Sequence, residues 1–348
     1  MNNKEKDCNN GTPLYKDHTR PISKRVEDLI SRMNIEEKVS QMVYSSSAIP
    51  ELEIPEYNWW NECLHGVGRA GIATVFPQAI GMSAMWDDDQ MHEIATTVSD
   101  EARAMYHEAV KKGNRGQYMG LTFWTPNINI FRDARWGRGQ ETYGEDPWLM
   151  GKLGSAFVRG IQGDHPEYLK AAACAKHYVV HSGPEALRHE FNAQASPKDM
   201  YETYLPAFKS LVDAGVEGVM CAYNRTNDLP CCGSKPLLVD ILREDWGFDG
   251  YIVSDCWALA DIHTTHDYTD TPVESAALAI NNTVNLNCGD NYPHLTEAVK
   301  QGLVEEATID SALKTLLKIR FRLGQFDPPE LNPYSDISAE VINSEEHR

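Results

Sequence analysis

Acidic and basic side chains that could bind a polyol are concentrated in one short stretch. "RDARWGRGQETYGED" (132–146) packs three arginines, four acids, Trp136 and Tyr143 into fifteen residues. Planar guanidinium and carboxylate groups can together bind several neighbouring hydroxyls, so this stretch predicts a polar cage. A salt-bridged surface loop is the alternative. Its last residues, Glu145 and Asp146 before Pro147, are also typical of the start of a helix.

Further reactive side chains stand where apolar runs end. "GYIVSDC" (250–256) is an apolar run that closes in Asp255, and Lys176 and His177 close the apolar run 171–180. Tyr223 closes a third run, 215–224. The carboxyl ends of strands carry the active site in doubly wound sheets and in (β/α)8 barrels, so these positions favour chemistry.

The elements that must position these residues alternate along the chain. The apolar runs predict strands at 121–131, 171–180, 215–224, 250–256 and 282–289. Amphipathic spacing predicts an opening helix within 23–42, then helices at 87–112, 147–162, 198–214, 235–245 and 272–281. Strands alternating with helices predict a parallel sheet, open or closed.

Length and composition are those of one globular catalytic domain. The 348 residues suit a (β/α)8 barrel with additional helices and loops. Fifty-one acidic and 32 basic residues give a net charge of −19, which disfavours nucleic acid and anionic membrane surfaces as partners. No apolar run is long enough to cross a membrane. The first residues lack the apolar core of a signal peptide, so we expect a cytoplasmic protein unless a leader has been removed.

Cofactor and metal motifs are missing from the sequence. It contains no G-x-G-x-x-G, P-loop, G-x-S-x-G or H-E-x-x-H pattern. His177, His181, Glu185 and His189 recur every four residues, but Gly183 and Pro184 interrupt that spacing, so a metal-dependent hydrolase is only an alternative. The eight cysteines form no C-x-x-C pair, and we expect neither a structural metal nor a disulfide framework.

Six ordered motifs give the chain a recognisable resemblance. "NECLHG", "ATVFPQAIG", "RDARWGRGQETYGEDP", "AKHY", "MCAYNRTND" and "GYIVSDC" occur in the order found in glycoside hydrolase family 3. From about residue 20 to the end, the chain resembles the N-terminal barrel domain of that family. The resemblance implies a retaining glycosidase on an α/β fold, a TIM-type (β/α)8 barrel, with no cofactor. Ala134 departs from the family's usual proline, which affects the stiffness of the loop.

The resemblance also implies roles for individual residues. Asp255 is the expected nucleophile. The expected sugar-binding residues are Glu62, Arg138, Glu141, Lys176, His177 and Tyr223, with Glu141 supporting Arg138. A glutamate before "CLHG" is more similar to the β-xylosidase branch than to the β-glucosidase branch, because Glu62 could fill the space of a hexose hydroxymethyl group.

The same comparison predicts how the chain is organised. We expect a polar lead-in at 1–20, a catalytic barrel at 21–325 and a linker at 326–348. The linker would lead to the family's α/β sandwich domain, a missing partner that usually supplies the catalytic acid. If the acid lies within this chain, Glu185 or Glu190 is the first candidate. The expected ligand is an oligosaccharide. A β-glucosidase, a silent sugar-binding barrel and a homo-oligomer remain alternatives.

Overall fold

The computed structural model describes residues 8–9 and 12–348. Residues 1–7 and 10–11 of the predicted lead-in lie outside the described residues. The strands are β1 Cys8–Asn9, β2 Thr12–Pro13, β3 Ser45–Ser46, β4 Tyr57–Asn58, β5 Cys174–Tyr178, β6 Asn192–Ala193, β7 Gly218–Cys221, β8 Arg225–Thr226, β9 Leu229–Pro230 and β10 Tyr251–Ser254.

The α-helices are α1 Ile22–Ile30, α2 Ile35–Ser40, α3 Ala79–Ser83, α4 Asp88–Lys111, α5 Pro147–Gln162, α6 Pro197–Asp199, α7 Pro206–Asp213, α8 Ala258–Thr264, α9 Pro272–Asn281, α10 Leu295–Lys300 and α11 Glu306–Arg322. Two π-helical segments are η5 Met200–Tyr204 and η7 Pro236–Asp245. Single 3-10 turns are η1 Leu14–Lys16, η2 Pro50–Leu52, η3 Gly139–Glu141, η4 Glu185–Leu187, η6 Cys231–Gly233, η8 Tyr292–His294, η9 Pro329–Leu331 and η10 Ala339–Val341.

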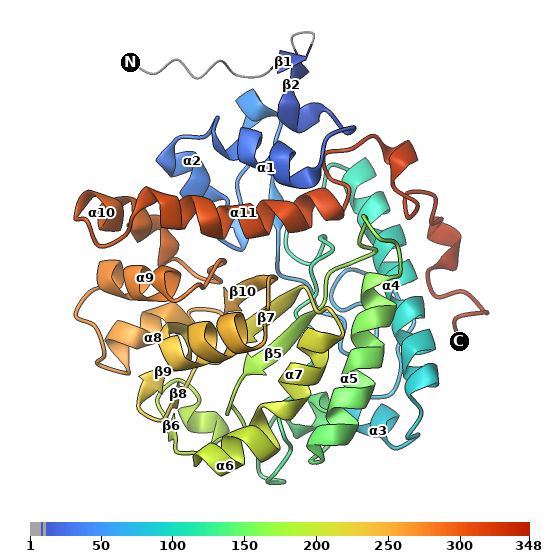
Figure 1. Ribbon diagram of the computed structural model, residues 1–348. Coiled ribbons are helices and arrows are strands. Elements are labelled where there is room, and N and C mark those ends of the chain that lie inside the picture. Colours follow the sequence, from blue (N-terminus) through green and yellow to red (C-terminus); the bar gives the residue numbers. More distant parts are fainter. Residues whose placement is uncertain (1–7, 10–11) are drawn as a thin grey trace.

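The strands form a barrel around which the helices are arranged (Figure 1). β5, β7 and β10 pair in parallel at its centre. On one side, Val253 bridges Leu286 and Asn287 bridges Val43; on the other, Thr122 bridges Ala172 and Phe123 bridges Asn61. The ring closes where β3 pairs with β4. This confirms a TIM-type barrel and shows that its closing contact is antiparallel.

Helix boundaries follow local sequence signals closely. Asp146 caps α5, accepting a hydrogen bond of 2.7 Å from the backbone N–H of Leu149, and Pro147 takes the first helical position. Helices α4, α5 and α9 lie within two residues of their predicted bounds. The predicted helix 198–214 was wrong in one respect, because it divides into α6, η5 and α7. Pro206 has no N–H to continue the hydrogen-bond ladder.

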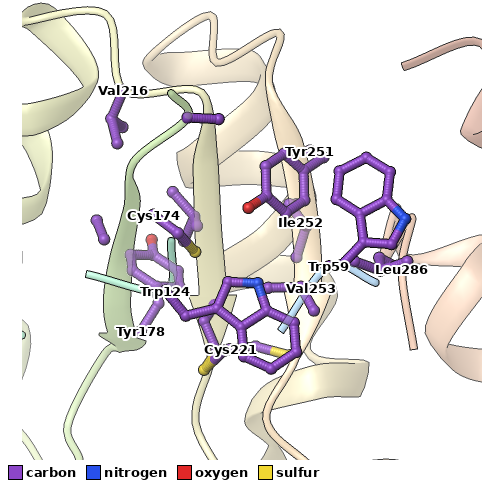
Figure 2. Packing of buried hydrophobic residues seen from close by; sticks show 14 of the residues in the cluster. Trp59, Trp124, Cys174, Tyr178, Val216, Cys221, Tyr251, Ile252, Val253 and Leu286 are labelled. Atoms are coloured by element: carbon purple, nitrogen blue, oxygen red, sulfur yellow. The ribbon is translucent and has the colours of Figure 1, made fainter. Parts of the chain in front are cut away.

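The core inside the barrel is built by large side chains from neighbouring strands (Figure 2). Trp59 is fully buried, and its ring centroid lies 5.4 Å from that of Tyr251 on β10. Gly218 on β7 makes room for Tyr251, since a Cβ at that position would come within 2.6 Å of its ring. This packing holds β7 and β10 in a fixed register, and their carboxyl ends therefore stay together.

Residues 326–348 pack back onto the barrel. Asp327 forms a buried ion pair with Arg25 of α1. Further on, Glu101 of α4 accepts hydrogen bonds from the backbone N–H of Asn343 at 2.8 Å and from Nδ1 of His347 at 2.9 Å. In Figure 1 this last segment runs beside α4. The division of the chain into lead-in, barrel and linker remains a prediction.

Two disulfides contradict the expectation that the chain has no disulfide framework. Cys221 pairs with Cys232, and Cys256 pairs with Cys288. Sequence spacing did not reveal these pairs because the partners meet only through the fold: Cys256 follows β10, and Cys288 follows the segment that bridges β10. Cys63, Cys174 and Cys231 are free and buried.

Within residues 8–9 and 12–348, no helix combines the length and apolarity that a membrane span requires.

Candidate active site

The seven predicted site residues line one pocket at the carboxyl ends of the central strands. The cavity holds about 590 Å³, and its walls include Glu62, Arg138, Glu141, Lys176, His177, Tyr223 and Asp255. They come from five separate segments of the chain. The barrel brings them together because parallel strands end on the same side.

Asp255 lies at the floor of this pocket, directly after β10. Its side chain is buried, and Oδ1 accepts a hydrogen bond of 2.8 Å from the backbone N–H of Cys256. Oδ2 has no hydrogen-bond partner among the described residues. One carboxylate oxygen is therefore held by the backbone, and the other is left for a ligand.

The pKa of Asp255 is raised above its ordinary value. Burial is the largest cause, and it outweighs the charges of Arg138 and Lys176 and the Cys256 N–H, which lower the pKa. The two basic neighbours therefore do not keep this pKa low. Burial disfavours the charged form of a carboxyl group more strongly here than the cations favour it.

His177 presents an unprotonated nitrogen to the pocket floor. Its Nδ1 lies 3.0 Å from Oδ1 of Asn129, which can only accept, so we assign the proton to Nδ1. Nε2 then carries the lone pair and lies 3.6 Å from Oδ2 of Asp255. Burial, followed by the charge of Arg138, lowers the pKa of His177 well below its ordinary value. The ring is neutral and can accept a hydrogen bond from a sugar hydroxyl.

Arg138 and Glu141 form a bidentate pair on the wall. Nε and Nη2 of Arg138 each donate to a different oxygen of Glu141, both at 2.7 Å. Asn127 donates to the same carboxylate at 3.2 Å. Burial raises the pKa of Glu141, but the hydrogen bonds and charge of Arg138 outweigh it and the net shift is downward. Glu141 therefore fixes the plane of the Arg138 guanidinium as an ionised partner.

Lys176 adds a second buried cation beside this pair. It is the β5 residue immediately before His177, and its side chain is buried. Burial, together with the charge of Arg138, lowers its pKa. With Arg69 and Arg188, the pocket lining holds four basic side chains and three carboxylates, a distribution that suits a ligand with many hydroxyl groups.

Glu62 also lines the pocket and lies on the loop after β4. Its Oε1 accepts a hydrogen bond of 3.1 Å from Nε1 of Trp60, and Oε2 lies 3.6 Å from Nε of Arg69. Two side chains therefore hold the carboxylate at a defined place in the pocket.

Aromatic rings form flat walls around these polar groups. Trp60, Trp124 and Trp257 all line the pocket, and the rings of Trp60 and Trp124 stack with centroids 5.6 Å apart. Of the other tryptophans, Trp59 belongs to the core and Trp136 lines a neighbouring cavity. Flat ring faces match the apolar faces of a pyranose.

Sequence reasoning missed several members of the lining. Arg69, Arg188, Leu64, Met220 and Cys256 also face the pocket, and His189, weighed only as a metal ligand, does so too. Arg188 and His189 lie on the long loop after β5, and no motif marks where that loop folds. Glu185, our fallback catalytic acid, lines the neighbouring cavity instead, and Glu190 is not among the residues of either lining.

The four-residue spacing of His177, His181, Glu185 and His189 does not correspond to one helix. His177 belongs to β5, and the short turn η4 begins at Glu185. Among the described residues, no group of three or more His, Cys, Asp or Glu side chains is arranged to hold a metal ion.

The sequence model of a protein family, the Glycosyl hydrolase family 3 N terminal domain, matches residues 25–319 of this chain. The chain therefore belongs to glycoside hydrolase family 3. A xylan 1,4-beta-xylosidase of Xylanibacter ruminicola is 44% identical over 95% of this chain and 39% of its own length. Probable beta-D-xylosidase 7 of Arabidopsis thaliana is 43% identical over 94% of this chain and 45% of its own length.

Solved family 3 structures share the barrel. A GH3 exo-beta-xylosidase in complex with a xylobiose aziridine probe superposes with a TM-score of 0.88 at 32% identity, covering 94% of this chain and 43% of that one. A beta-glucosidase from Listeria innocua in complex with glucose gives a TM-score of 0.79 at 26% identity, covering 94% of this chain and 50% of that one. This family 3 chain spans less than half the length of these curated relatives.

Proposed function

We propose that this chain carries the nucleophile and the sugar-binding site of a retaining, exo-acting β-xylosidase. The observation that carries the proposal is Asp255. Its carboxylate is buried at a strand end, has one oxygen free, and lies in a pocket with Lys176, His177 and the Arg138–Glu141 pair. The similarity to xylosidases over 94–95% of the chain supports the choice of substrate class.

In the proposed mechanism, a carboxylate oxygen of Asp255 attacks the anomeric carbon of a terminal β-xylosyl unit. The bond from that carbon to the leaving oxygen breaks as the new ester bond forms, and the leaving oxygen takes a proton from a general acid. Water then attacks the glycosyl ester, which releases xylose and restores Asp255. A retaining enzyme needs its two carboxyl groups about 5 to 5.5 Å apart.

The basic groups would act mainly on the transition state. Hydroxyls of the sugar become better hydrogen-bond partners as the ring flattens and gains positive charge. Arg138 is already oriented by Glu141, which Asn127 also contacts, and neutral His177 is oriented by Asn129. Preorganised partners of this kind lower the barrier because they do not reorganise during reaction.

The preference for a pentose rests on Glu62. Because Trp60 and Arg69 hold its carboxylate, the side chain would fill the space that a hexose hydroxymethyl group needs. A β-glucosidase remains the second candidate, supported by the superposition on the Listeria innocua enzyme.

The decisive experiment is covalent trapping of the nucleophile. Treatment with a dinitrophenyl 2-deoxy-2-fluoro-β-xyloside should add one glycosyl mass to the peptide that contains Asp255, read by mass spectrometry. Asp255→Asn should abolish labelling and leave the circular dichroism spectrum unchanged, because the amide is nearly isosteric but a poor nucleophile. Glu145→Gln, an exposed acid at the end of the 132–146 stretch, is the control and should label normally. A label on another acid would overturn the assignment.

A further inference from the structure

Four side chains form a continuous polar chain along the rim of the pocket. Nδ1 of His189 lies 2.8 Å from Oδ2 of Asp261 on α8. Nε of Arg188 donates to Nε2 of His189 at 3.3 Å, and Nη1 of Arg188 donates to Oε1 of Glu185 at 2.9 Å. The order is Asp261, His189, Arg188, Glu185. Both middle residues line the same pocket as Asp255.

The donors and acceptors in this chain define one tautomer of His189. Arg188 can only donate, so Nε2 must accept and carry a lone pair. The ring proton then resides on Nδ1 and points to the Asp261 carboxylate. In this state His189 is neutral, and its Nε2 is occupied by Arg188. The geometry does not present His189 as a proton donor to a leaving group.

The chain bears directly on Tyr223, a neighbour of the nucleophile. The Arg188 guanidinium lies 5.3 Å from the Tyr223 ring centroid, and the His189 ring centroid lies 4.3 Å from it. The tyrosine is thus contacted by both middle members of the chain. Burial, followed by the charge of Asp255, raises the pKa of Tyr223.

The loop that carries Arg188 and His189 is anchored from α8 at two points. Besides the Asp261 contact, Oγ1 of Thr265 donates to the backbone carbonyl of His189 at 2.8 Å. Asp261 of α8 therefore holds the side chain of His189, and Thr265, the residue after α8, holds its backbone carbonyl. A residue anchored in this way can determine where its neighbour Arg188 lies.

We propose that His189, oriented by Asp261, is a positioning residue that holds Arg188 and Tyr223 in place around the nucleophile, and that protonation of His189 releases them. This inference rests on the proposed glycosyl transfer at Asp255. Acidification would place a proton on Nε2, which would then face the N–H of Arg188. Two donors and two positive charges would oppose each other, so the Arg188 contact would be lost.

Several other groups surround His189 and define the setting of this change. They are Asp261 and His266 from α8 and the turn after it, Arg188 in the loop, Tyr223 after β7, Arg225 of β8, and Asp255, whose charge acts on Asp261. Of these groups, Arg188 and Asp261 are the two that form hydrogen bonds with the His189 ring.

Two substitutions of similar size separate positioning from simple packing. His189→Gln can place an acceptor oxygen near the position of Nε2 and so keep the Arg188 contact. His189→Asn places its amide near the position of Nδ1 and loses that contact. We expect kcat/KM for dinitrophenyl β-xyloside at neutral pH to fall by about ten- to a hundredfold in His189→Asn, with kcat falling in parallel and KM little changed. In His189→Gln, kcat/KM should stay within about threefold of the wild-type value.

The pH profile of kcat/KM tests whether protonation of His189 releases Arg188 and Tyr223. The acidic limb of kcat/KM should move to lower pH in His189→Gln, because glutamine does not titrate. His263→Gln is the matched control: His263 lies on α8, the helix that carries Asp261, bonds to Ser275 through Nδ1, and does not line the pocket. It should keep both the wild-type rate and the wild-type profile.

The outcomes are decisive for the inference. Equal losses of kcat/KM in His189→Asn and His189→Gln would indicate that His189 acts by packing alone. An acidic limb that stays in place in His189→Gln would show that protonation of His189 does not cause that limb. Either result overturns the proposal. If wild-type protein labels at Asp255 while His189→Asn keeps full activity, only this inference fails. If wild-type protein does not label at all, the proposed function fails first.

Discussion

Single residues in this pocket are held against their own solvation preference. As the proposed nucleophile, Asp255 would have to be ionised, yet burial raises its pKa. Lys176 is buried as a cation whose pKa burial lowers. Such groups reduce the stability of the empty site. They are retained where a ligand or a transition state compensates for the lost hydration.

This conflict predicts that Asp255→Asn stabilises the protein. The folded-state pKa lies above the unfolded value, so the ionised carboxylate destabilises the fold at neutral pH, and this loss develops as pH rises through the unfolded pKa. Removing the charge should raise Tm by a few degrees; in domains of 150 to 250 residues 1 kcal/mol corresponds to roughly 2 to 4 °C. Calorimetry of both proteins at pH 7 would measure it. A lower Tm would show that the cations, and not burial, dominate the energetics of this carboxylate.

Glu62 gives a second prediction at the scale of one side chain. Glu62→Asp shortens the side chain by one methylene and should weaken the contact with Trp60. Aryl β-xylosides should be preferred over aryl β-glucosides by the wild type, and the substitution should narrow the ratio of kcat/KM values. A methylene in a fitted pocket is worth about 1 to 3 kcal/mol. Glu145→Asp, away from the pocket, should leave the ratio unchanged. A wild-type preference for glucosides would contradict the xylosidase assignment while leaving the family intact.

At the scale of elements, strand ends place the chemistry and helix caps limit the loops between them. β5 ends in the Lys176 to Tyr178 segment, β7 is followed by Tyr223, and β10 by Asp255. The 132–146 stretch, which carries Arg138 and Glu141, ends where Asp146 caps α5. The sequence favoured a polar cage or a salt-bridged surface loop for this stretch, and a helix start for its last residues. In the structure the ion-paired Arg138 and Glu141 line the pocket, and Asp146 and Pro147 begin α5.

The capping interaction predicts a loss of stability without a loss of chemistry. Asp146→Ala removes the acceptor for the Leu149 N–H, and loss of such a cap typically costs about 1 kcal/mol. Urea denaturation should detect it, while labelling of Asp255 should remain complete. Glu145→Ala, its exposed neighbour, should change stability by less than about 0.5 kcal/mol. If Asp146→Ala abolished labelling, Asp146 would have a role beyond the helix start.

At the scale of the whole molecule, the described part of the chain places the proposed nucleophile in a pocket whose other carboxyl groups are already engaged. Besides Asp255, the carboxyl groups in the pocket lining are Glu62 and Glu141. Glu141 is an ion-pair partner of Arg138, and Glu62 is held by Trp60 and Arg69. Nε2 of His189 accepts from Arg188. None of these groups is arranged to protonate a departing oxygen.

The 348-residue chain should therefore depend strongly on the leaving group. Dinitrophenyl β-xyloside, whose phenolate departs without a proton, should be cleaved without a basic limb in the pH profile. Xylobiose should be slower than expected for an enzyme with a general acid by about 10² to 10⁴. Release of xylose and of dinitrophenolate can be followed in parallel assays. Rapid hydrolysis of xylobiose with a bell-shaped profile would show that an acid within this chain is in place.

Local signals in the sequence determined the bounds of several helices and the residues that stand at strand ends, whereas the predicted strands 121–131 and 282–289 form only isolated bridges. Asp146–Pro147 and Thr271–Pro272 begin helices because capping and proline geometry act within a few residues. The family motifs identified the seven residues that the barrel gathers into one pocket. Only the tertiary structure decided the two disulfides, the direction of the Asp255 pKa shift, and the presence of Arg188 and His189 at the pocket rim. Burial and distances between segments far apart in the chain control these properties, and neither can be read from neighbours in sequence.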